Sequence, residues 1–225
     1  CFNAARSATA IVYQREGGII QRITYGELMR ITRQVAAGLR VMGIEPGAPI
    51  AIDMPMTAES IAIYLGIVWA GCSVVSIADS FAAEEIAIRL DLGQAQLIFT
   101  QDVVLRGGKT LPLYERVVAA NAPPAIVLDG RTDHPAVLLR RSDITWSEFL
   151  GKEETDAAVC TSETHINVLF SSGTTGQPKA IPWTHTTPIK CAADGYLHHD
   201  IHQGEIVAWP TNLGWMMGPW LIYAS

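Results

Sequence analysis

Signals for helices and for strands alternate along most of this chain, and this alternation constrains the fold more than any other feature. Apolar residues at spacings of three and four predict helices over residues 25–42, 57–70, 81–92, 113–120 and 187–197. Short apolar runs predict buried strands over residues 49–54, 74–77, 96–100, 125–128, 166–170 and 205–209. Because strands and helices repeat with short links, we expect an α/β fold of parallel, doubly wound sheets with flanking helices.

Local signals mark where two of the helices begin. Thr24 and Glu27 form a capping-box pattern ahead of an apolar repeat that ends near Gly43. Thr145 and Glu148 repeat the pattern within residues 129–164, a polar and weakly patterned stretch. We interpret that stretch as a linking excursion between ordered regions.

Composition excludes several classes of protein. The 225 residues are 49% hydrophobic and only 17% charged, so the chain is rich in core residues rather than disordered. Its net charge is −6 and no run of basic residues exceeds two, which argues against nucleic acid as a partner. Four widely spaced cysteines without a CxxC pair favour a reducing, intracellular compartment.

A membrane span is the main alternative for residues 60–78, which contain no charge. Acidic residues flank the stretch on both sides, and the lysines and arginines that anchor a spanning helix are missing. Gly71 and Cys72 divide it into a helix-like half and a β-branched half. We therefore predict two short core elements and no membrane span.

One polar string follows directly on a predicted strand. Residues 171–179 read SSGTTGQPK, with two glycines, four hydroxyl side chains and one lysine. Glycines let backbone N–H groups turn inward, and hydroxyls and a lysine add donors and charge, which together suit a polyphosphate. A flexible surface turn would have a similar composition. A Walker loop is excluded, because Pro178 precedes Lys179 and the GxxxxGK[ST] spacing is missing.

In its order of residues, this string resembles the phosphate-binding signature of the adenylate-forming (AMP-binding) superfamily. The similarity continues through ITYGEL, AGCSVVSIADSFAAEEIAIRL and LRGGKTLPL. Within the superfamily the chain is most similar to acyl-CoA synthetases of the acetyl-CoA-synthetase-like branch, and to plant acyl-activating enzymes in particular. The resemblance implies that residues 1–225 are a partial AMP-binding (adenylation) N-terminal domain, incomplete and without the mobile C-terminal domain.

The resemblance also assigns the residues that bind ATP. Carried over by position, the ATP phosphates are bound by Ser171, Ser172, Gly173, Thr174, Thr175, Gly176 and Lys179, and Lys179 is the catalytic residue. Ala180 stands where the family usually has glycine. That change affects at most the local freedom of the backbone.

Two further sites are implied by the family. Related CoA ligases bind the phosphate end of CoA at the positions of Arg106 and Lys109, although by itself RGGK is typical of a solvated turn. The family commonly has Gly-Gly before the phenylalanine that is Phe81 here, whereas this chain has Asp79 and Ser80, a departure from the usual CoA path.

The acyl pocket of acetyl-CoA synthetases corresponds to Trp215, Met216 and Met217. Flexible methionines suit an adaptable apolar pocket, but an aromatic residue with two methionines is also typical of plain core. Relatives specific for acetate carry Val-Thr where this chain has Met-Met. The resemblance therefore does not define the acyl group.

Two groups of histidines imitate functional sites. A first group consists of His198, His199, Asp200 and His202, in which His198 and His202 have the i, i+4 spacing of two metal ligands on one helical face. The sequence offers no third ligand to complete that pair, and we predict no metal site in the chain. His185 follows Lys179 by six residues, and we expect it to pack behind the phosphate loop.

The resemblance implies an ATP-dependent acid:CoA ligase, an AMP-forming acyl-CoA synthetase that makes a carbon–sulfur bond. Its substrates would be a carboxylic acid, ATP and CoA, with Mg²⁺ accompanying ATP. We expect the parent protein to occupy the peroxisome or the cytoplasm. The expectation for the 225-residue piece alone is that it is inactive; the alternative is a truncated, non-catalytic product that binds phosphate or another copy.

Overall fold

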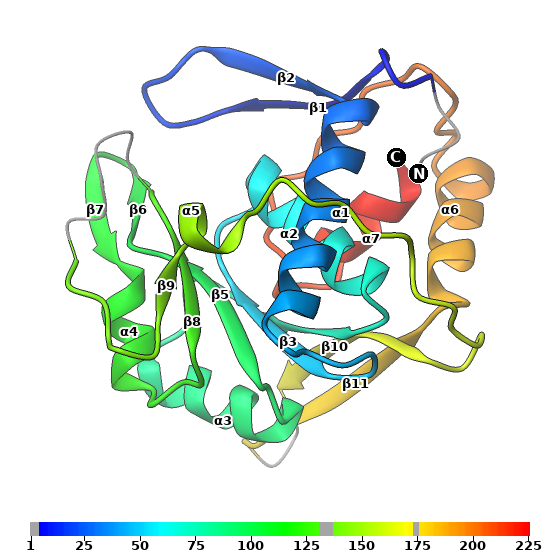
Figure 1. Ribbon diagram of the computed structural model, residues 1–225. Coiled ribbons are helices and arrows are strands. Elements are labelled where there is room, and N and C mark those ends of the chain that lie inside the picture. The colour runs from blue at the N-terminus through cyan, green and yellow to red at the C-terminus, as the bar shows by residue number, and fades with distance from the viewer. Residues whose placement is uncertain (1–4, 131–136, 173–175) are drawn as a thin grey trace.

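The computed structural model describes residues 5–130, 137–172 and 176–225 (Figure 1). Its elements in chain order are β1 (Thr9–Gln14), β2 (Ile20–Thr24), α1 (Tyr25–Val41), β3 (Pro49–Asp53), α2 (Ala58–Trp69), β4 (Ser73–Ile77), α3 (Ala83–Gly93), β5 (Leu97–Gln101), β6 (Val103–Arg106), β7 (Lys109–Pro112), α4 (Leu113–Ala119), β8 (Ala125–Leu128), β9 (Ile144–Thr145), α5 (Trp146–Phe149), β10 (His165–Ser172), β11 (Pro178–Thr184), α6 (Thr187–His198) and α7 (Met217–Ala224).

Seven of the described strands form one sheet, in the order β11-β10-β4-β3-β5-β8-β9. The strands from β10 to β9 run parallel, and β11 alone returns antiparallel beside β10. Every residue of β4, β5 and β8 is buried, as expected of a parallel sheet that is covered on both faces. The predicted doubly wound α/β fold is confirmed.

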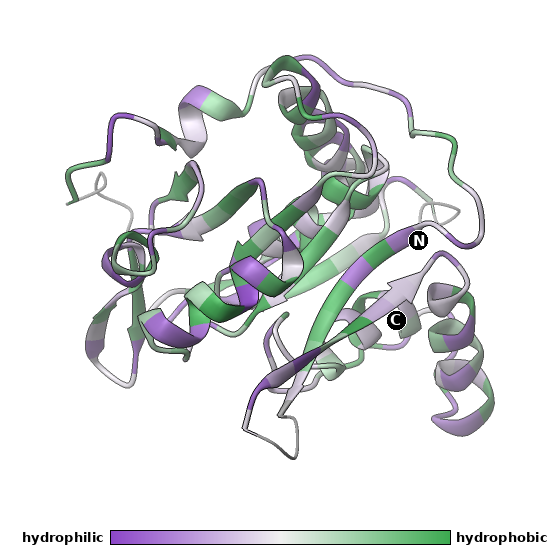
Figure 2. Cartoon of the chain, turned by 90° about the horizontal axis from the view of Figure 1, so that it is seen from below, coloured by the Kyte–Doolittle hydropathy of each residue, from purple (hydrophilic) through white to green (hydrophobic). Residues whose placement is uncertain are grey.

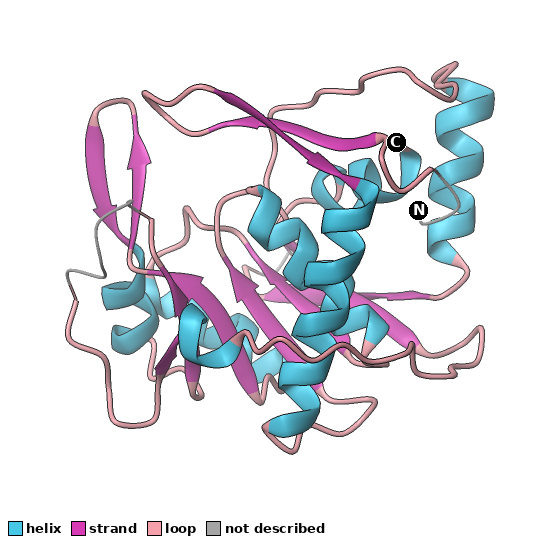
Figure 3. Cartoon of the chain, turned by 45° about the horizontal axis from the view of Figure 1, so that its top comes forward, coloured by secondary structure: helices cyan, strands magenta, loops and turns pink. Residues whose placement is uncertain are grey.

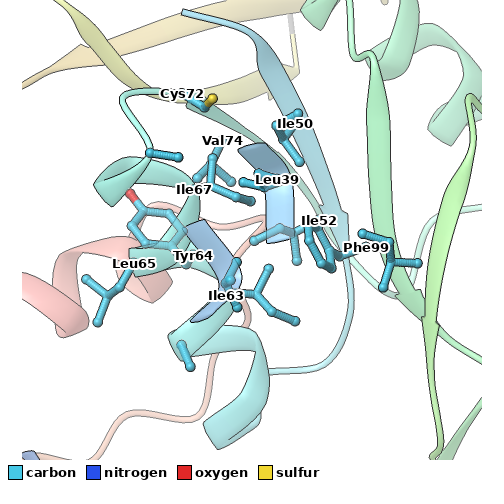
Figure 4. Packing of buried hydrophobic residues seen from close by; sticks show 14 of the residues in the cluster. Leu39, Ile50, Ile52, Ile63, Tyr64, Leu65, Ile67, Cys72, Val74 and Phe99 are labelled. Atoms are coloured by element: carbon cyan, nitrogen blue, oxygen red, sulfur yellow. The ribbon is translucent and has the colours of Figure 1, made fainter. Parts of the chain in front are cut away.

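Helices cover the two faces of the sheet in pairs. Ile52 and Phe99 pack with α1 and α2 on one face, which Figure 4 shows from close by. On the other face, α3 and α4 pack against Ala51, Ile98 and Val127. Ala51 and Ile98 directly precede Ile52 and Phe99 in their strands, so their side chains point to the opposite face. Figure 2 shows hydrophobic residues gathered along the central strands, while the surrounding helices carry hydrophilic stripes.

The uncharged stretch of residues 60–78 divides as predicted, into most of α2 and all of β4. Among the described helices, none is long and apolar enough to cross a membrane. Both capping boxes also form. The Thr24 hydroxyl accepts a hydrogen bond from the Glu27 N–H at 3.2 Å, and Thr145 and Glu148 make the same arrangement at the start of α5.

Three features of the structure differ from the sequence prediction. The strand expected over residues 205–209 is wrong, because no described strand pairs with that segment and the side chains of Ile206 and Trp209 are exposed. The edge of the sheet is occupied instead by β11, whose residues were expected to be loop. Two ribbons, β1–β2 and β6–β7, were also not predicted, and Figure 3 shows both standing outside the main sheet.

Candidate nucleotide and acyl site

The predicted phosphate loop is the turn of the β10–β11 hairpin. Ser171 pairs across the hairpin with Lys179, and Ser172 pairs with Pro178. Gly173, Thr174 and Thr175 lie outside the described residues, and Gly176 has a positive φ of 82° that suits glycine. Because β10 runs parallel to β4, this turn lies at the carboxyl edge of the sheet, where open α/β sheets bind their ligands.

Lys179 is exposed at the start of β11, and the strand that follows it distinguishes the loop from a Walker loop, which opens a helix. Cross-strand partners project from the same face of a ribbon, so Ser171 and Lys179 can approach one anion from one side.

His185 is not behind the phosphate loop, and that prediction is wrong. Thr184 pairs with His165 at the start of β10, so His185 follows the end of the hairpin opposite to the turn. Seven strand residues separate it from the turn, a span of about 20 Å. Partial burial lowers the pKa of the His185 imidazole, which therefore favours the neutral form.

The residues predicted to bind CoA lie at the turn of the β6–β7 hairpin. Arg106 and Lys109 are cross-strand partners, and Gly107 and Gly108 between them have φ values of 59° and 73°. Two consecutive residues with positive φ make the tight hairpin turn for which glycine is required. Both predicted cations are therefore held next to one turn.

The backbone of this turn already binds an anionic group. The Gly107 and Gly108 N–H groups donate to the two carboxylate oxygens of Glu16, at 2.9 and 2.7 Å. Successive N–H groups that point the same way form an anion-binding nest. Glu16 comes from the turn of the β1–β2 ribbon and was not singled out from the sequence, because no local pattern links it to a turn 91 residues away.

A cleft of about 720 Å³ places Arg106, but not Lys109, beside the three residues predicted to line the acyl pocket. Its walls are formed by Met56, Asp79, Arg106, Trp209, Pro210, Thr211, Asn212, Trp215, Met216 and Met217. Trp215 and Met216 are 50% and 59% exposed, so neither is plain core. None of the described residues of the phosphate loop lines this cleft.

Asp79 lies at the centre of the cleft's polar contacts. Its side chain is fully buried, and one oxygen accepts a hydrogen bond from Arg106 Nη2 at 2.6 Å. The other oxygen accepts from Asn212 Nδ2 at 3.0 Å. The acid that stands in place of the family's glycine is therefore the partner of the arginine predicted to bind CoA.

A line of stacked side chains runs from the cleft toward the phosphate loop. The Trp215 and Phe81 rings have centroids 6.0 Å apart, and the Arg89 guanidinium lies 3.8 Å from the Phe81 centroid and 5.7 Å from that of Phe170. Phe170 directly precedes Ser171. Burial lowers the pKa of Arg89, a residue that sequence reasoning missed.

Asp53 is a second buried carboxylate at the same edge. It ends β3 and has no hydrogen-bond partner among the described residues. Burial raises the pKa of Asp53 well above its usual range, and the nearby charge of Asp79 adds to the rise. Thr100, its cross-strand neighbour on β5, is also buried, with a hydroxyl that lacks a partner within the described chain.

The histidines of the metal-like motif are dispersed in the structure. His198 ends α6, the His199 ring contacts Trp220, and His202 Nε2 lies 2.8 Å from an Asp200 oxygen. Within the described residues, no three His, Cys, Asp or Glu side chains are grouped so that they could hold a metal ion.

Comparison with known proteins identifies the family. The profile described as AMP-binding enzyme matches residues 2–225. The chain belongs to the AMP-binding enzyme family. This AMP-binding chain is 50% identical to hexanoyl-CoA synthase of Cannabis sativa, over 99% of its own length and 32% of the relative. It is 51% identical to probable acyl-activating enzyme 17, peroxisomal, of Arabidopsis thaliana, over 92% of the chain and 29% of that protein.

A solved structure agrees with both relatives. The acetoacetyl-CoA synthetase from Streptomyces lividans superposes with a TM-score of 0.87 at 25% identity, over 96% of this chain and 34% of that one. The chain thus spans about a third of the length of the curated relatives that it matches. The predicted membership of the adenylate-forming superfamily, in its acyl-CoA synthetase branch, is confirmed.

Proposed function

We propose that this chain is the front part of an ATP-dependent acid:CoA ligase. The observation that carries the proposal is the pairing of Ser171 with Lys179 at the carboxyl edge of the sheet, within the string SSGTTGQPK. The chain that carries this string is 50% identical to hexanoyl-CoA synthase over 99% of the chain and 32% of that enzyme. In this proposal the chain contributes part of the adenylation domain, and the remaining groups of the active site come from elsewhere in the longer protein.

The first half-reaction joins the acid to AMP. A carboxylate oxygen of the acid attacks the α-phosphorus of ATP, an acyl–phosphate bond forms, and the bond to the β-phosphate breaks to release pyrophosphate. In this proposal the phosphates are held by the predicted phosphate loop, which consists of Ser171, Ser172, Gly173, Thr174, Thr175, Gly176 and Lys179. Lys179 would offset the charge that develops on pyrophosphate as it leaves, which is the main contribution a protein makes to phosphoryl chemistry.

The second half-reaction transfers the acyl group. The CoA thiol attacks the acyl carbon, a carbon–sulfur bond forms, and the bond to AMP breaks. In this proposal a CoA phosphate is bound by the β6–β7 turn, through Arg106, Lys109 and the N–H groups of Gly107 and Gly108. The acyl site is lined by Trp215, Met216 and Met217. The proposal is supported by the cleft, which Arg106 shares with these three side chains.

Mg²⁺ is proposed to enter with ATP. Magnesium is usually held by substrate phosphates, several waters and one or two carboxylates. The described residues contain no group of three His, Cys, Asp or Glu side chains that could hold a metal ion. The peroxisome is proposed as a compartment because two Arabidopsis relatives are described as peroxisomal; the cytoplasm is the alternative.

The test is carboxylate-dependent release of pyrophosphate by the longer protein, with straight-chain acids from acetate to laurate, followed by CoA-dependent formation of the thioester. Lys179→Ala is expected to lower kcat roughly 100- to 1,000-fold, because it removes a charge aimed at the reacting phosphates. Lys190→Ala is the matched control, since that exposed lysine on α6 pairs only with Asp194 within the described structure. Equal activity in the Lys179 variant and the control would refute the role of the loop.

A further inference from the structure

Asp79 is the one fully buried carboxylate that contacts both the turn predicted to bind CoA and the segment predicted to line the acyl site, within the residues described here. A buried charge is costly unless it is paired and hydrogen-bonded. Each oxygen of Asp79 meets one donor, from Arg106 on one side and from Asn212 on the other. The carboxylate therefore connects two segments that are 106 residues apart in sequence.

On its first side, Asp79 orients an arginine. The Arg106 side chain is 52% exposed and lines the cleft, while its Nη2 is held by the buried acid at 2.6 Å. A guanidinium has five N–H donors in a fixed plane, so the bond to Asp79 leaves other donors of Arg106 available to a ligand in the cleft that it lines. Asp79 thereby sets where a second anion can meet Arg106.

On its second side, Asp79 holds the segment that carries Trp215. Asn212 donates to Asp79 through its amide nitrogen, and its amide oxygen accepts from the Gly214 N–H at 3.0 Å. Gly214 lies so close to the end of β4 that a Cβ would be 2.2 Å from the Ala78 nitrogen. The turn before Trp215 is therefore pressed against the residues that lead into Asp79.

We infer that Asp79 is a positioning residue that fixes Arg106 and the Asn212 turn relative to each other, and so couples CoA binding to the acyl side of the cleft. This inference rests on the proposed function. Asp79 would touch neither substrate, and it would act through the two side chains that it holds.

The hydrogen-bonding pattern makes the inference specific. Asp79 offers two acceptors to two donors, whereas an asparagine offers one acceptor and one donor. Asn212 is not free to turn its amide over, because its oxygen is engaged by Gly214. Asp79→Asn must therefore lose one of its two contacts. In the double variant Asp79→Asn/Asn212→Asp, the new asparagine can accept from Arg106 and donate to the new aspartate, whose other oxygen still accepts from Gly214.

The experiment uses the longer protein and measures kcat and KM separately for acid, ATP and CoA. Asp79→Asn is expected to raise the KM for CoA roughly tenfold, the effect of one lost buried hydrogen bond, with the KM for ATP unchanged. Asn212→Asp is expected to raise the KM for CoA at least as much, because it sets a second carboxylate against the Asp79 oxygen that accepts from Asn212. The double variant is expected to recover most of the loss. A purely structural effect would lower the amount of active enzyme without changing the KM for CoA alone.

Asp143→Asn is the matched control. That aspartate is also fully buried and paired with an arginine, Arg140, but it lies away from the cleft. An unchanged KM for CoA in Asp79→Asn, or a change equal to that of Asp143→Asn, would overturn the inference, as would a double variant no better than the worse single one. If Asp79→Asn does not fold, Asn212→Asp and the double variant decide. A wild-type protein that forms adenylate but no thioester would instead refute the proposed function.

Discussion

Asp143 and Asp53 are buried carboxylates at opposite edges of the same sheet, and their surroundings are opposite in kind. At the amino edge, next to β8 and β9, Asp143 accepts hydrogen bonds from Arg140, Tyr114, Ser142 and the Ala125 N–H. At the carboxyl edge, Asp53 is more deeply buried than Asp143, and its carboxylate has no hydrogen-bond partner in the described parts of the chain. The contrast separates a carboxylate that holds the fold together from one that the fold leaves unpaired.

The pKa shifts follow the same contrast. Burial acts to raise the pKa of Asp143, but the hydrogen bonds from Arg140, Tyr114 and Ala125 outweigh it and the pKa is lowered. Burial raises the pKa of Asp53, and the charge of Arg116 offsets only part of that rise, because no described donor makes a hydrogen bond to the carboxylate. Unsatisfied polar groups are unusual in folded proteins and cluster at functional sites. The carboxyl edge, which also holds the phosphate turn and the cleft, therefore contains an unpaired buried carboxylate that lowers the free energy of unfolding.

The largest effect is expected at the amino edge. Asp143→Ala should lower the free energy of unfolding by about 3 kcal/mol, because it leaves Arg140 partly buried without its partner and removes the acceptor for Tyr114. Urea denaturation of the longer protein, followed by fluorescence, measures the loss. Asp156→Ala is the control, since that carboxylate pairs with Arg33 but is 97% exposed. Equal losses in the two variants would mean that Asp143 is not the structural anchor.

The two pKa shifts have opposite directions, so the two aspartates affect stability in opposite ways as the pH changes. The lowered pKa of Asp143 means that its contribution is present above the pKa of an unfolded aspartate, near 4, and is lost as the pH falls through the folded value. The raised pKa of Asp53 works the other way. Its protonated form is favoured in the fold, so stability is full below about pH 4 and declines as the pH rises toward the folded value.

Asp53→Asn is therefore expected to stabilise the protein at neutral and alkaline pH. An asparagine cannot ionise, so the variant removes a decline of up to about 1.4 kcal/mol per pH unit. The test is to measure the free energy of unfolding of both proteins between about pH 5 and 8. In roughly this range an aspartate is ionised in the unfolded chain. Parallel curves for wild type and variant would show that Asp53 ionises normally in the fold. Acid-dependent pyrophosphate release in the same variant tells whether the unpaired carboxylate also affects activity.

The elements of the main sheet could be predicted from sequence because both faces are buried. Strands such as β4 and β5 contain short runs of apolar residues, and helices such as α1 begin at a capping box that is visible in the sequence alone. The segment at residues 205–209 has the same apolar character, but its side chains are exposed and no described strand lies beside it. A strand needs a partner, and the partner is not encoded locally.

The candidate site was only partly predictable for a related reason. The phosphate turn and the RGGK turn stand out because each is a contiguous string. Glu16 and Asn212 do not, because each acts on a residue far away in the chain: Glu16 on Gly107 and Asn212 on Asp79. The sequence shows Asp79 as a departure from the family, but its pairing with Arg106 is visible only in three dimensions.

The smallest effect is expected at the exposed end of the carboxyl edge. There the Gly107 and Gly108 N–H groups are already engaged by Glu16, which a phosphate would have to displace. Glu16→Gln removes the charge of this competitor while keeping an oxygen for the turn. It is therefore expected to lower the KM for CoA about two- to fivefold, the scale of an exposed electrostatic contact. Dephospho-CoA in the same assay decides what the nest binds. If Glu16 competes with a phosphate, the gain in affinity is confined to CoA. An equal gain for both compounds would mean that Glu16 only fastens the β1–β2 ribbon to the β6–β7 turn.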